Sequence, residues 1–372
     1  MKGTPAENGF SFPPEWHRHR GTWISWPRPE GISFPGRYHE AIEDIARLIR
    51  VLVAREQVHL NVPNDNYERL VRGFLEARKV PLRRVFFHHI PTNECWTRDH
   101  GPAFVLRKRR GRTEAAIVDW GYNAWGGKYP PYDADDAVPT RIAEELRLPV
   151  FYPGIVMEGG AVDFNGAGTV LTTTSCLLNK NRNPHLRQGY GGQARAKQRI
   201  EKYLKLYYGQ KHVIWLGEGI AGDDTDGHID DLARFLDERT IAIGIETNRR
   251  DANYAVLQKA RRALDKARDQ DGRPFDILEL PMPKPMSIDG QRLPATYMNF
   301  YFVNGALLVP TFGQRDRDTR ALTILQRRLP SREVIGVDCR ALIWGLGAIH
   351  CFTQQQPSAG LTLDRRRRNV VT

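Results

Sequence analysis

Short apolar runs of strand character alternate along the chain with longer amphipathic segments of helical character. Runs rich in Val, Ile and Leu, bounded by Gly, Pro or Asn, predict strands at 57–62, 240–244 and 306–310. Apolar residues recur every three or four positions across 38–56 and 253–268, which predicts amphipathic helices with one buried face. Because both patterns continue along the chain without a linker rich in Pro or Ser, we predict a mixed α/β fold.

Two segments depart from this alternation. Three glycines within 188–193 predict a flexible surface loop, which we interpret as an insertion because no phosphate-binding Gly-Lys-Ser/Thr sequence follows them. The end of the chain, 358–372, includes four consecutive arginines from Arg365 to Arg368. We therefore expect one domain over 1–357, followed by a disordered basic tail.

Composition limits the classes of protein to which the chain can belong. Of its 372 residues, 41% are hydrophobic and 26% are charged, which is typical of a globular protein with a sizeable core. No apolar run is long enough to span a bilayer, and the first residues lack the pattern of a signal peptide. The four cysteines form no C-x-x-C pair, so we expect no disulfide framework, no zinc knuckle and a cytoplasmic location.

The formal net charge of +12 raises the alternative of a basic nucleic-acid-binding protein. The basic residues are scattered, however, or occur in short runs such as 107–110, which we place in a hairpin turn between 103–106 and 115–118. The sequence shows no helix-turn-helix, zinc-finger or aromatic RNA-binding motif. We therefore interpret the charge as solvated surface, and we expect no nucleic-acid partner and no membrane association.

Polar residues are concentrated in four separated segments that contain more acidic and aromatic residues than packing requires. These segments hold Trp96 with Asp99, Glu158 before two glycines, His228 with Asp230, and Cys351 in a Gly-rich turn. A cysteine thiolate attacks an electrophilic carbon, and a histidine carries protons to the leaving group and from water. His350 would point to the opposite face of an extended segment, so we interpret it as structural.

The carboxylates indicate which substrate the thiolate would attack. Asp99, Asp230 and Glu158 would disfavour the oxyanion of a protease reaction, but they suit a cationic substrate. A guanidinium offers five N–H donors in one plane, and each carboxylate can accept two of them side by side. We therefore predict that Cys351 attacks a guanidinium carbon, while Asp99 and Asp230 bind the nitrogens. Glu158 would support this binding or orient His228, which transfers protons.

Five motifs make the chain resemble the agmatine deiminase family, which also includes bacterial-type peptidylarginine deiminases, within the guanidino-group-modifying superfamily. The motifs are WTRDHGP at 96–102, EGG at 158–160, GDDTDGHID at 222–230, YMNFY at 297–301 and IHCFTQQ at 349–355. The resemblance implies a five-bladed α/β propeller, or pentein, of ββαβ units around a pseudo-fivefold axis. It places the active site in the central cavity.

The same resemblance implies roles for individual residues. Cys351 would be the nucleophile, and His228 the general acid and base. Asp99 and Asp230 would bind the guanidinium, with Glu158 as their acidic partner. Asp224 would approach the substrate, and Trp96 and Trp120 would help to form the pocket wall. The resemblance implies no metal or organic cofactor, and such enzymes commonly form dimers or larger homo-oligomers.

The expected activity is hydrolysis of agmatine to N-carbamoylputrescine and ammonia through a covalent adduct on Cys351, as part of polyamine and putrescine biosynthesis. The nearest alternative is the same chemistry on another guanidine, such as peptidyl or free arginine. A basic nucleic-acid-binding protein is a more distant alternative. A cysteine protease is more distant still, because the chain lacks a Cys-Gly-x-Cys-Trp sequence.

Overall fold

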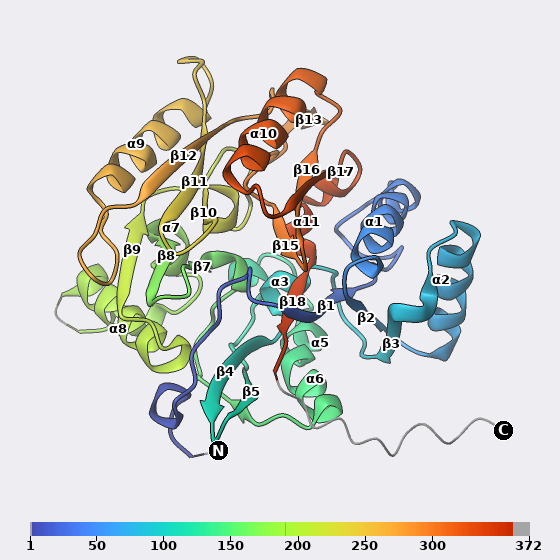
Figure 1. The fold of residues 1–372 in the computed structure, drawn as a ribbon, viewed down its shortest axis with the longest axis horizontal. Coiled ribbons are helices and arrows are strands. Elements are labelled where there is room, and N and C mark those ends of the chain that lie inside the picture. Colours follow the sequence, from blue (N-terminus) through green and yellow to red (C-terminus); the bar gives the residue numbers. More distant parts are fainter. Residues whose placement is uncertain (1, 190, 360–372) are drawn as a thin grey trace.

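The computed structural model describes residues 2–189 and 191–359. Within them, five sheets share one arrangement, in which one strand pairs antiparallel with one neighbour and parallel with the other (Figure 1). Helices connect the parallel strands, because a parallel connection requires a crossover. The mixed α/β fold predicted from the sequence is therefore confirmed.

Each sheet is assembled from strands that follow one another in the chain, except where the last strand returns to the first. The first sheet joins β18 (Gln354–Pro357) to β1 (His19–Ser25), β2 (Gln57–Val62) and β3 (Val85–His89). The second and third contain β4 (Ala103–Arg109), β5 (Arg112–Val118) and β6 (Val150–Phe151), then β7 (Val162–Phe164), β8 (Thr169–Thr173) and β9 (His212–Leu216). The last two contain β10 (Ala233–Phe235), β11 (Thr240–Ile245) and β12 (Asp276–Pro281), then β15 (Tyr301–Val303), β16 (Ala306–Thr311) and β17 (Glu333–Asp338).

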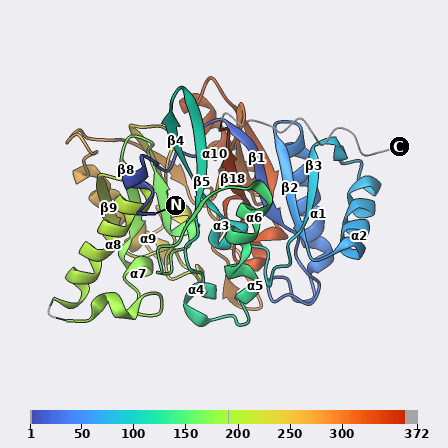
Figure 2. The ribbon, with the colours of Figure 1, turned by 90° about the horizontal axis from the view of Figure 1, so that it is seen from below.

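The longer helices are amphipathic and cover the sheets. They are α1 (Tyr38–Val53), α2 (Asp65–Ala77), α6 (Val138–Leu146), α8 (Gly192–Tyr208), α9 (Asn253–Lys266) and α10 (Arg315–Arg328). In the view of Figure 2, α1 and α2 lie at one end of the molecule and α8 at the other, with β1, β4, β5 and β18 between them. The hydrophobic core accordingly lies between helices and sheets, and its largest cluster joins α1 and α10 to β2 and β16.

The elements predicted from hydrophobic spacing are present, with shifts at their ends. The strand predicted at 57–62 is β2, and those at 240–244 and 306–310 are β11 and β16, each one residue longer. The helices predicted at 38–56 and 253–268 are α1 and α9, which end three and two residues earlier. The predicted hairpin is also present as β4 and β5, although its turn is confined to Arg110 and Gly111, both with positive φ.

Short turns just before the first strand of each sheet supply the polar segments singled out in the sequence. They are α3 (Thr97–His100) before β4, η3 (Gly159–Ala161) before β7, η5 (Ile229–Asp231) before β10 and α11 (Ile349–Phe352) before β18. The segment 297–300 occupies the same place before β15. Consecutive turns contact one another, α11 with α3, α3 with η3, and η3 with η5. One equivalent turn from each sheet is therefore brought to a common centre.

Several shorter elements complete the description. They are α4 (Ala124–Gly127), α5 (Asp133–Asp136), α7 (Thr174–Leu177), the hairpin β13 (Ser287–Ile288) with β14 (Gln291–Arg292), and the 3-10 turns η1 (Ala6–Asn8), η2 (Leu82–Arg84), η4 (Pro184–Arg187) and η6 (Leu342–Gly345). In the Gly-rich segment 188–193, α8 already begins at Gly192, while residue 190 lies outside the described residues. The predicted disordered tail lies outside them from residue 360 onward, including Arg365 to Arg368.

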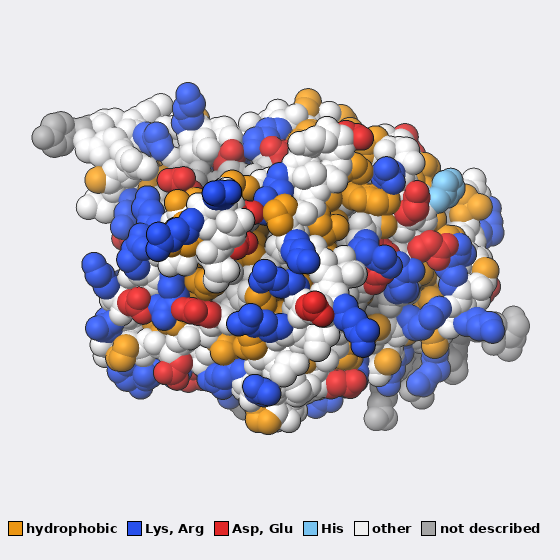
Figure 3. All heavy atoms as spheres, turned by 90° about the horizontal axis from the view of Figure 1, so that it is seen from above, with side chains coloured by type: hydrophobic (Ala, Val, Ile, Leu, Met, Phe, Trp, Pro, Cys, Tyr) orange, Lys and Arg blue, Asp and Glu red, His pale blue; other side chains and the backbone are white. Residues whose placement is uncertain are grey.

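Basic side chains are dispersed over the surface. On the face shown in Figure 3, Lys and Arg side chains are spread widely, with acidic side chains between them. Many arginines in the described part of the chain also pair with carboxylates, for example Arg261 with Glu279 and Arg328 with Asp237. Of the described helices, none combines the length and the apolar character that crossing a bilayer requires.

Candidate active site

Two of the converging turns, α3 and α11, open into a pocket whose deepest residues are almost fully buried. Cys351 and Asp99 line the pocket with exposed fractions of 5% and 6%, whereas Ile32, which also lines it, is 52% exposed. The remaining wall comes from segments far apart in the chain, and includes Phe34, Trp96, Trp125, Tyr129, Asp224, Asp289, Trp344 and Leu346. The pocket therefore leads from an apolar, aromatic wall to a buried thiol and a buried carboxylate.

Cys351 is held in place by an asparagine from the neighbouring unit. The Asn299 side chain accepts hydrogen bonds from the backbone N–H groups of His350 (2.9 Å) and Cys351 (3.3 Å). Its Nδ2 donates to Cys351 Sγ at 3.1 Å, and Sγ lies 3.7 Å from Asp230 Oδ2. Burial, together with Asp230, Asp231 and Asp99, raises the pKa of the Cys351 thiol well above its usual value. The thiol is therefore protonated when the surrounding carboxylates are ionised.

Asp99 is a buried carboxylate whose two oxygens are fixed by separate donors. Oδ1 accepts from the Gly160 backbone N–H at 3.0 Å, and Oδ2 accepts from Trp125 Nε1 at 2.9 Å. Burial raises the pKa of Asp99 to about 6, although the neighbouring His228 opposes this rise. At neutral pH the group is thus largely ionised, and it is placed to accept from a cation in the pocket.

His228 lies next to Asp99 and is positioned through its backbone. Its N–H donates to Asp223 Oδ2 and Thr225 Oγ1, both at 3.0 Å. Ring Nδ1 is 3.6 Å from Asp99 Oδ1. Burial lowers the pKa of the imidazole, but nearby Asp99 and other acidic groups outweigh burial and raise the pKa well above its usual value. His228 is therefore charged and can supply a proton.

A glycine is required at 160 because the backbone there approaches these side chains. A Cβ at Gly160 would lie 2.5 Å from His228 Nδ1 and 2.8 Å from Asp99 Oδ1. A similar constraint explains the Gly-rich turn before Cys351, because a Cβ at Gly345 or Gly347 would lie 2.5 Å from the Trp96 ring. The glycines of two sequence motifs thus make room for the side chains that the other motifs contribute.

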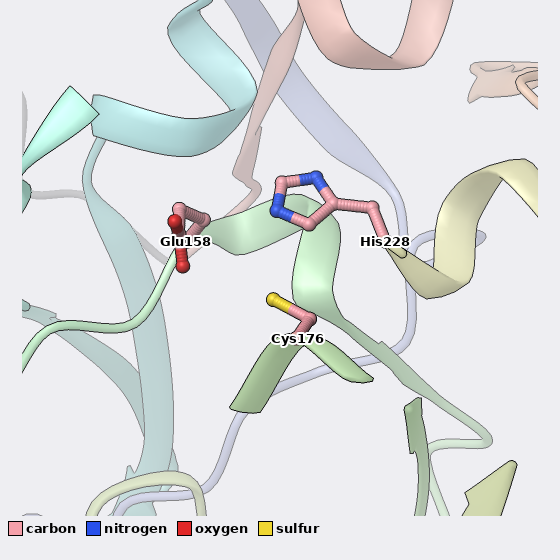
Figure 4. Close-up of side chains that lie close together, drawn as sticks. All are labelled: Glu158, Cys176 and His228. Atoms are coloured by element: carbon pink, nitrogen blue, oxygen red, sulfur yellow. The ribbon is translucent and has the colours of Figure 1, made fainter. Parts of the chain in front are cut away.

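Glu158 lies on the other side of His228, and it is anchored by Arg182. Arg182 Nε donates to Glu158 Oε1 at 2.6 Å, and Arg182 Nη2 donates to the carbonyl of Thr225 at 2.8 Å, which ties Glu158 to the turn that carries His228. Figure 4 shows Cys176 directed toward the His228 ring and the Glu158 side chain near both. Of the two roles that the sequence left open for Glu158, this position favours the second, which is to orient His228. Cys176 was not predicted as a site residue.

Asp230 belongs to a buried network that extends to the N-terminal segment. Its Oδ2 is 2.6 Å from His350 Nδ1, and His350 Nε2 is 2.7 Å from Glu15 Oε2. Glu15 also pairs with Arg234 at 3.0 Å. Burial raises the pKa of Asp230, but His350 and His228 outweigh it, so the pKa is lowered overall. Asp230 therefore stays ionised beside the thiol.

The sequence interpretation of His350 needs correction. Residues 349–352 form the helical turn α11 and not an extended segment, because Asn299 accepts the N–H groups of two successive residues there. As a result, the His350 ring does not point away from the site but bridges Asp230 and Glu15. Sequence reasoning had no signal for Glu15, which precedes every motif.

We expect His350→Gln to lower kcat/KM by about 10- to 100-fold while leaving the fold intact. A glutamine amide offers donors on one nitrogen only, so it cannot bridge Asp230 and Glu15 as the two ring nitrogens do. Steady-state kinetics with a guanidine substrate should show the loss mainly in KM, since Asp230 would be less well placed. Glu15→Gln should give a loss in the same direction. A kcat/KM unchanged in both variants would contradict this positioning role.

The structure places Trp96 and Asp224 in the pocket wall but not Trp120. Trp96 lines the pocket and donates from Nε1 to Ser33 Oγ at 2.9 Å. Asp224 also lines it, and its carboxylate accepts from the Tyr129 hydroxyl. Trp120 instead packs in a separate hydrophobic cluster, with its ring 5.1 Å from that of Tyr208.

Trp125 takes the position that the sequence assigned to Trp120. It lines the pocket and contacts Asp99 directly. Trp120 lies two residues after the end of β5 and packs in the core beside α8, whereas Trp125 lies in the turn α4 with φ of 54°. The turn-forming sequence around it, Asn123 to Gly127, was the signal that could have identified it.

Comparison with known proteins agrees with this arrangement of residues. Residues 11–357 match the family described as Porphyromonas-type peptidyl-arginine deiminase. An agmatine deiminase of Pseudomonas aeruginosa is 35% identical, with 95% of this chain and 97% of the relative covered. Two solved structures are also similar. Agmatine deiminase of C. jejuni, a Cys-to-Ser variant with substrate bound, has a TM-score of 0.82 at 33% identity, covering 94% of this chain and 97% of that one.

The second solved structure is agmatine deiminase of Enterococcus faecalis, with a TM-score of 0.86 at 29% identity, covering 96% of this chain and 98% of that one. These similarities extend over nearly the whole length of each protein. From the family match and the similarity together, the chain belongs to the Porphyromonas-type peptidyl-arginine deiminase family.

Proposed function

We propose that this protein is an agmatine deiminase, which hydrolyses agmatine to N-carbamoylputrescine and ammonia. The observation that carries the proposal is a buried thiol, Cys351, which shares the pocket with Asp99 and lies 3.7 Å from Asp230, while His228 lies 3.6 Å from Asp99. Carboxylates at this depth suit a guanidinium and disfavour an oxyanion. The relatives with extensive similarity are named agmatine deiminases, which supports the same substrate.

The reaction begins when the guanidinium enters between Asp99 and Asp230. Its positive charge offsets the carboxylates that raise the thiol pKa, so Cys351 loses its proton to solvent more readily once substrate is bound. The thiolate then forms a C–S bond with the guanidinium carbon, and one C–N bond breaks. The departing nitrogen takes a proton from His228 and leaves as ammonia.

The second half of the reaction regenerates the thiolate. The neutral His228 ring takes a proton from water, and the hydroxide attacks the carbon of the S-alkylthiouronium adduct. The C–S bond breaks, the electron pair returns to Cys351 Sγ, and the remaining hydroxyl proton passes to solvent as the ureido product forms. Glu158 and Asp99 lie beside the imidazole in both steps, and their negative charge favours its return to the protonated form.

The five repeated sheets support a further structural proposal. Each supplies one turn to the same centre, as expected for a five-bladed α/β propeller of ββαβ units with the pocket on its axis. In this arrangement β18 closes the ring by pairing with β1, which joins the two ends of the chain.

Arginine-containing substrates are the alternative that a specific residue favours. Arg37 lines the pocket, and its guanidinium lies 4.1 Å from the centroid of the Trp344 ring, where it could pair with the carboxylate of free or C-terminal arginine. Asp224 and Asp289 line the same pocket and would favour the distal ammonium of agmatine. An ammonia-release assay on agmatine, arginine and arginine-terminated peptides therefore tests the proposal. We expect kcat/KM for agmatine to exceed the others by at least about 10-fold, and the reverse order would overturn it.

The pH dependence of kcat/KM should show an acidic limb set by Asp99. Because burial raises the pKa of this carboxyl to about 6 in the free enzyme, it is protonated below that pH and cannot pair with the guanidinium. We expect kcat/KM to fall up to about tenfold per pH unit below about pH 6. Bound cation favours the ionised carboxylate, so the acidic limb of kcat should lie at lower pH. A kcat/KM that is flat down to pH 5 in enzyme that stays folded would contradict this assignment.

A further inference from the structure

Three side chains that could bind a metal ion converge beside the catalytic pocket. Glu158 precedes η3, Cys176 lies in α7, and His228 precedes η5, so each comes from a different turn. Their potential ligand atoms all lie within 4.8 Å of one another, and all three residues are fully buried. Figure 4 shows the Cys176 sulfur directed toward the His228 ring and the Glu158 side chain near both.

Several polar atoms in this cluster lack the partners that buried polar atoms usually have. Glu158 Oε2 and both ring nitrogens of His228 are buried and make no hydrogen bond to any described residue. Buried polar atoms are nearly always hydrogen bonded, so unpaired ones indicate an additional ligand or a functional role. Neither step of the proposed reaction needs Cys176, which leaves the thiol beside the imidazole without an assigned function.

The donor set identifies the class of ion. One sulfur, one imidazole nitrogen and one carboxylate oxygen suit Zn²⁺ and similar thiophilic cations, whereas Mg²⁺ and Ca²⁺ prefer oxygen ligands alone. Around Zn²⁺, tetrahedral ligands are separated by about 3 to 4 Å. The three side chains would therefore have to approach one another by only about 1 Å, and a fourth position would remain for water.

We propose that Glu158, Cys176 and His228 form an inhibitory binding site for a thiophilic divalent cation such as Zn²⁺. Binding releases two protons to solvent, one from the Cys176 thiol and one from the charged His228 ring, and a metal–sulfur bond and a metal–nitrogen bond take their places. The imidazole then neither protonates ammonia nor activates water, so turnover stops until the metal leaves. The inhibitory consequence rests on the proposed role of His228, whereas metal binding by the cluster does not.

Metal binding itself is tested with Co²⁺ as a spectroscopic probe. The catalytic thiol must be removed first, because Asp230, Asp231 and Cys351 form a second group of possible ligands. We expect the Cys351→Ala protein to bind Co²⁺ and to show a thiolate-to-cobalt charge-transfer band in the near ultraviolet. Adding Cys176→Ser should remove the band, whereas adding Cys339→Ser, a buried cysteine elsewhere in the fold, should leave it. A band that survives Cys176→Ser, or no band in any variant, would overturn the proposal.

Inhibition is tested separately in protein that retains Cys351. We expect Zn²⁺ to inhibit agmatine hydrolysis, a chelator to reverse it, and Cys176→Ser to raise the inhibitory Zn²⁺ concentration at least about tenfold. Each variant is normalised to its own metal-free rate, and Cys339→Ser should respond as the unmodified protein does. Equal Zn²⁺ sensitivity in both variants would place inhibition at another site and contradict the inference. If agmatine is not a substrate, the cobalt measurement still tests the metal site, so the two failures are distinguishable.

Discussion

Cys351→Ala is expected to abolish deimination, with kcat lowered by at least about 10⁴-fold. No other group in the described structure is placed to take over the attack. Asp230, which is 3.7 Å from Sγ, is an acceptor held by His350, and Cys176 does not line the pocket and has a pKa raised by burial. Ammonia release over hours of incubation, together with mass spectrometry of the protein after mixing with agmatine, should show neither product nor adduct.

The same variant should still bind substrate, because the carboxylates that grip the guanidinium are untouched. Burial and three carboxylates keep the Cys351 thiol protonated and therefore neutral, so its removal takes no negative charge away from the bound guanidinium. We therefore expect agmatine to raise the thermal midpoint of the variant at least as much as that of the unmodified protein. Cys339→Ala, which replaces a buried cysteine outside the pocket, is the matched control and should keep near-normal kcat/KM. Substantial turnover by Cys351→Ala would overturn the assignment of the nucleophile.

Local patterns predicted the elements well because those patterns reflect local physics. The helix α1 follows from its apolar stripe, and β4 and β5 pair as a hairpin because they are close in the chain. Pairing between distant strands has no such local signal. That β18 joins β1 depends on contacts between residues more than 330 positions apart, such as Pro357 with His19. The five sheets were therefore anticipated from the family resemblance and not from periodicity.

The candidate site was predictable at positions where a polar or glycine residue occurs in a motif that packing alone does not explain. Cys351, His228, Asp99 and the glycines of the 158–160 motif all meet at the pocket or beside it. Residues that support them from other parts of the chain gave no signal. Asn299 reshapes the turn of the nucleophile into a helix, which overrides the extended conformation inferred for His350.

Arg182 and Cys176 show the same limit. Arg182 is fully buried against Glu158, although an isolated arginine in an Asn-rich loop predicts only surface charge. Cys176 is fixed by the cap of α7, where the Thr173 hydroxyl accepts its N–H at 3.3 Å, and only the packing of α7 against the neighbouring turn brings it to His228. Contacts of this kind depend on the completed fold, so a single sequence does not reveal them.

His228→Ala is expected to block both halves of the reaction, with kcat again lowered by at least about 10⁴-fold. The imidazole donates the proton that makes ammonia a leaving group, and its neutral form then activates water. Without it, attack on the guanidinium carbon is reversible and unproductive, so the adduct should not accumulate. This distinguishes His228 from a residue needed only for hydrolysis, whose loss would leave Cys351 trapped as a stable thiouronium.

Rapid mixing with excess agmatine, acid quenching and intact-protein mass spectrometry separates these outcomes. The unmodified enzyme should show a transient mass increase and continuous ammonia release, while His228→Ala should show neither. His350→Gln is the matched control, because it alters another buried histidine of the same site but retains both proton-transfer steps. An adduct that accumulates in His228→Ala would show that a different group protonates ammonia. The acid of the first half would then be sought among the carboxyls around Cys351, starting with Asp99, whose pKa of about 6 leaves a minor protonated fraction at neutral pH.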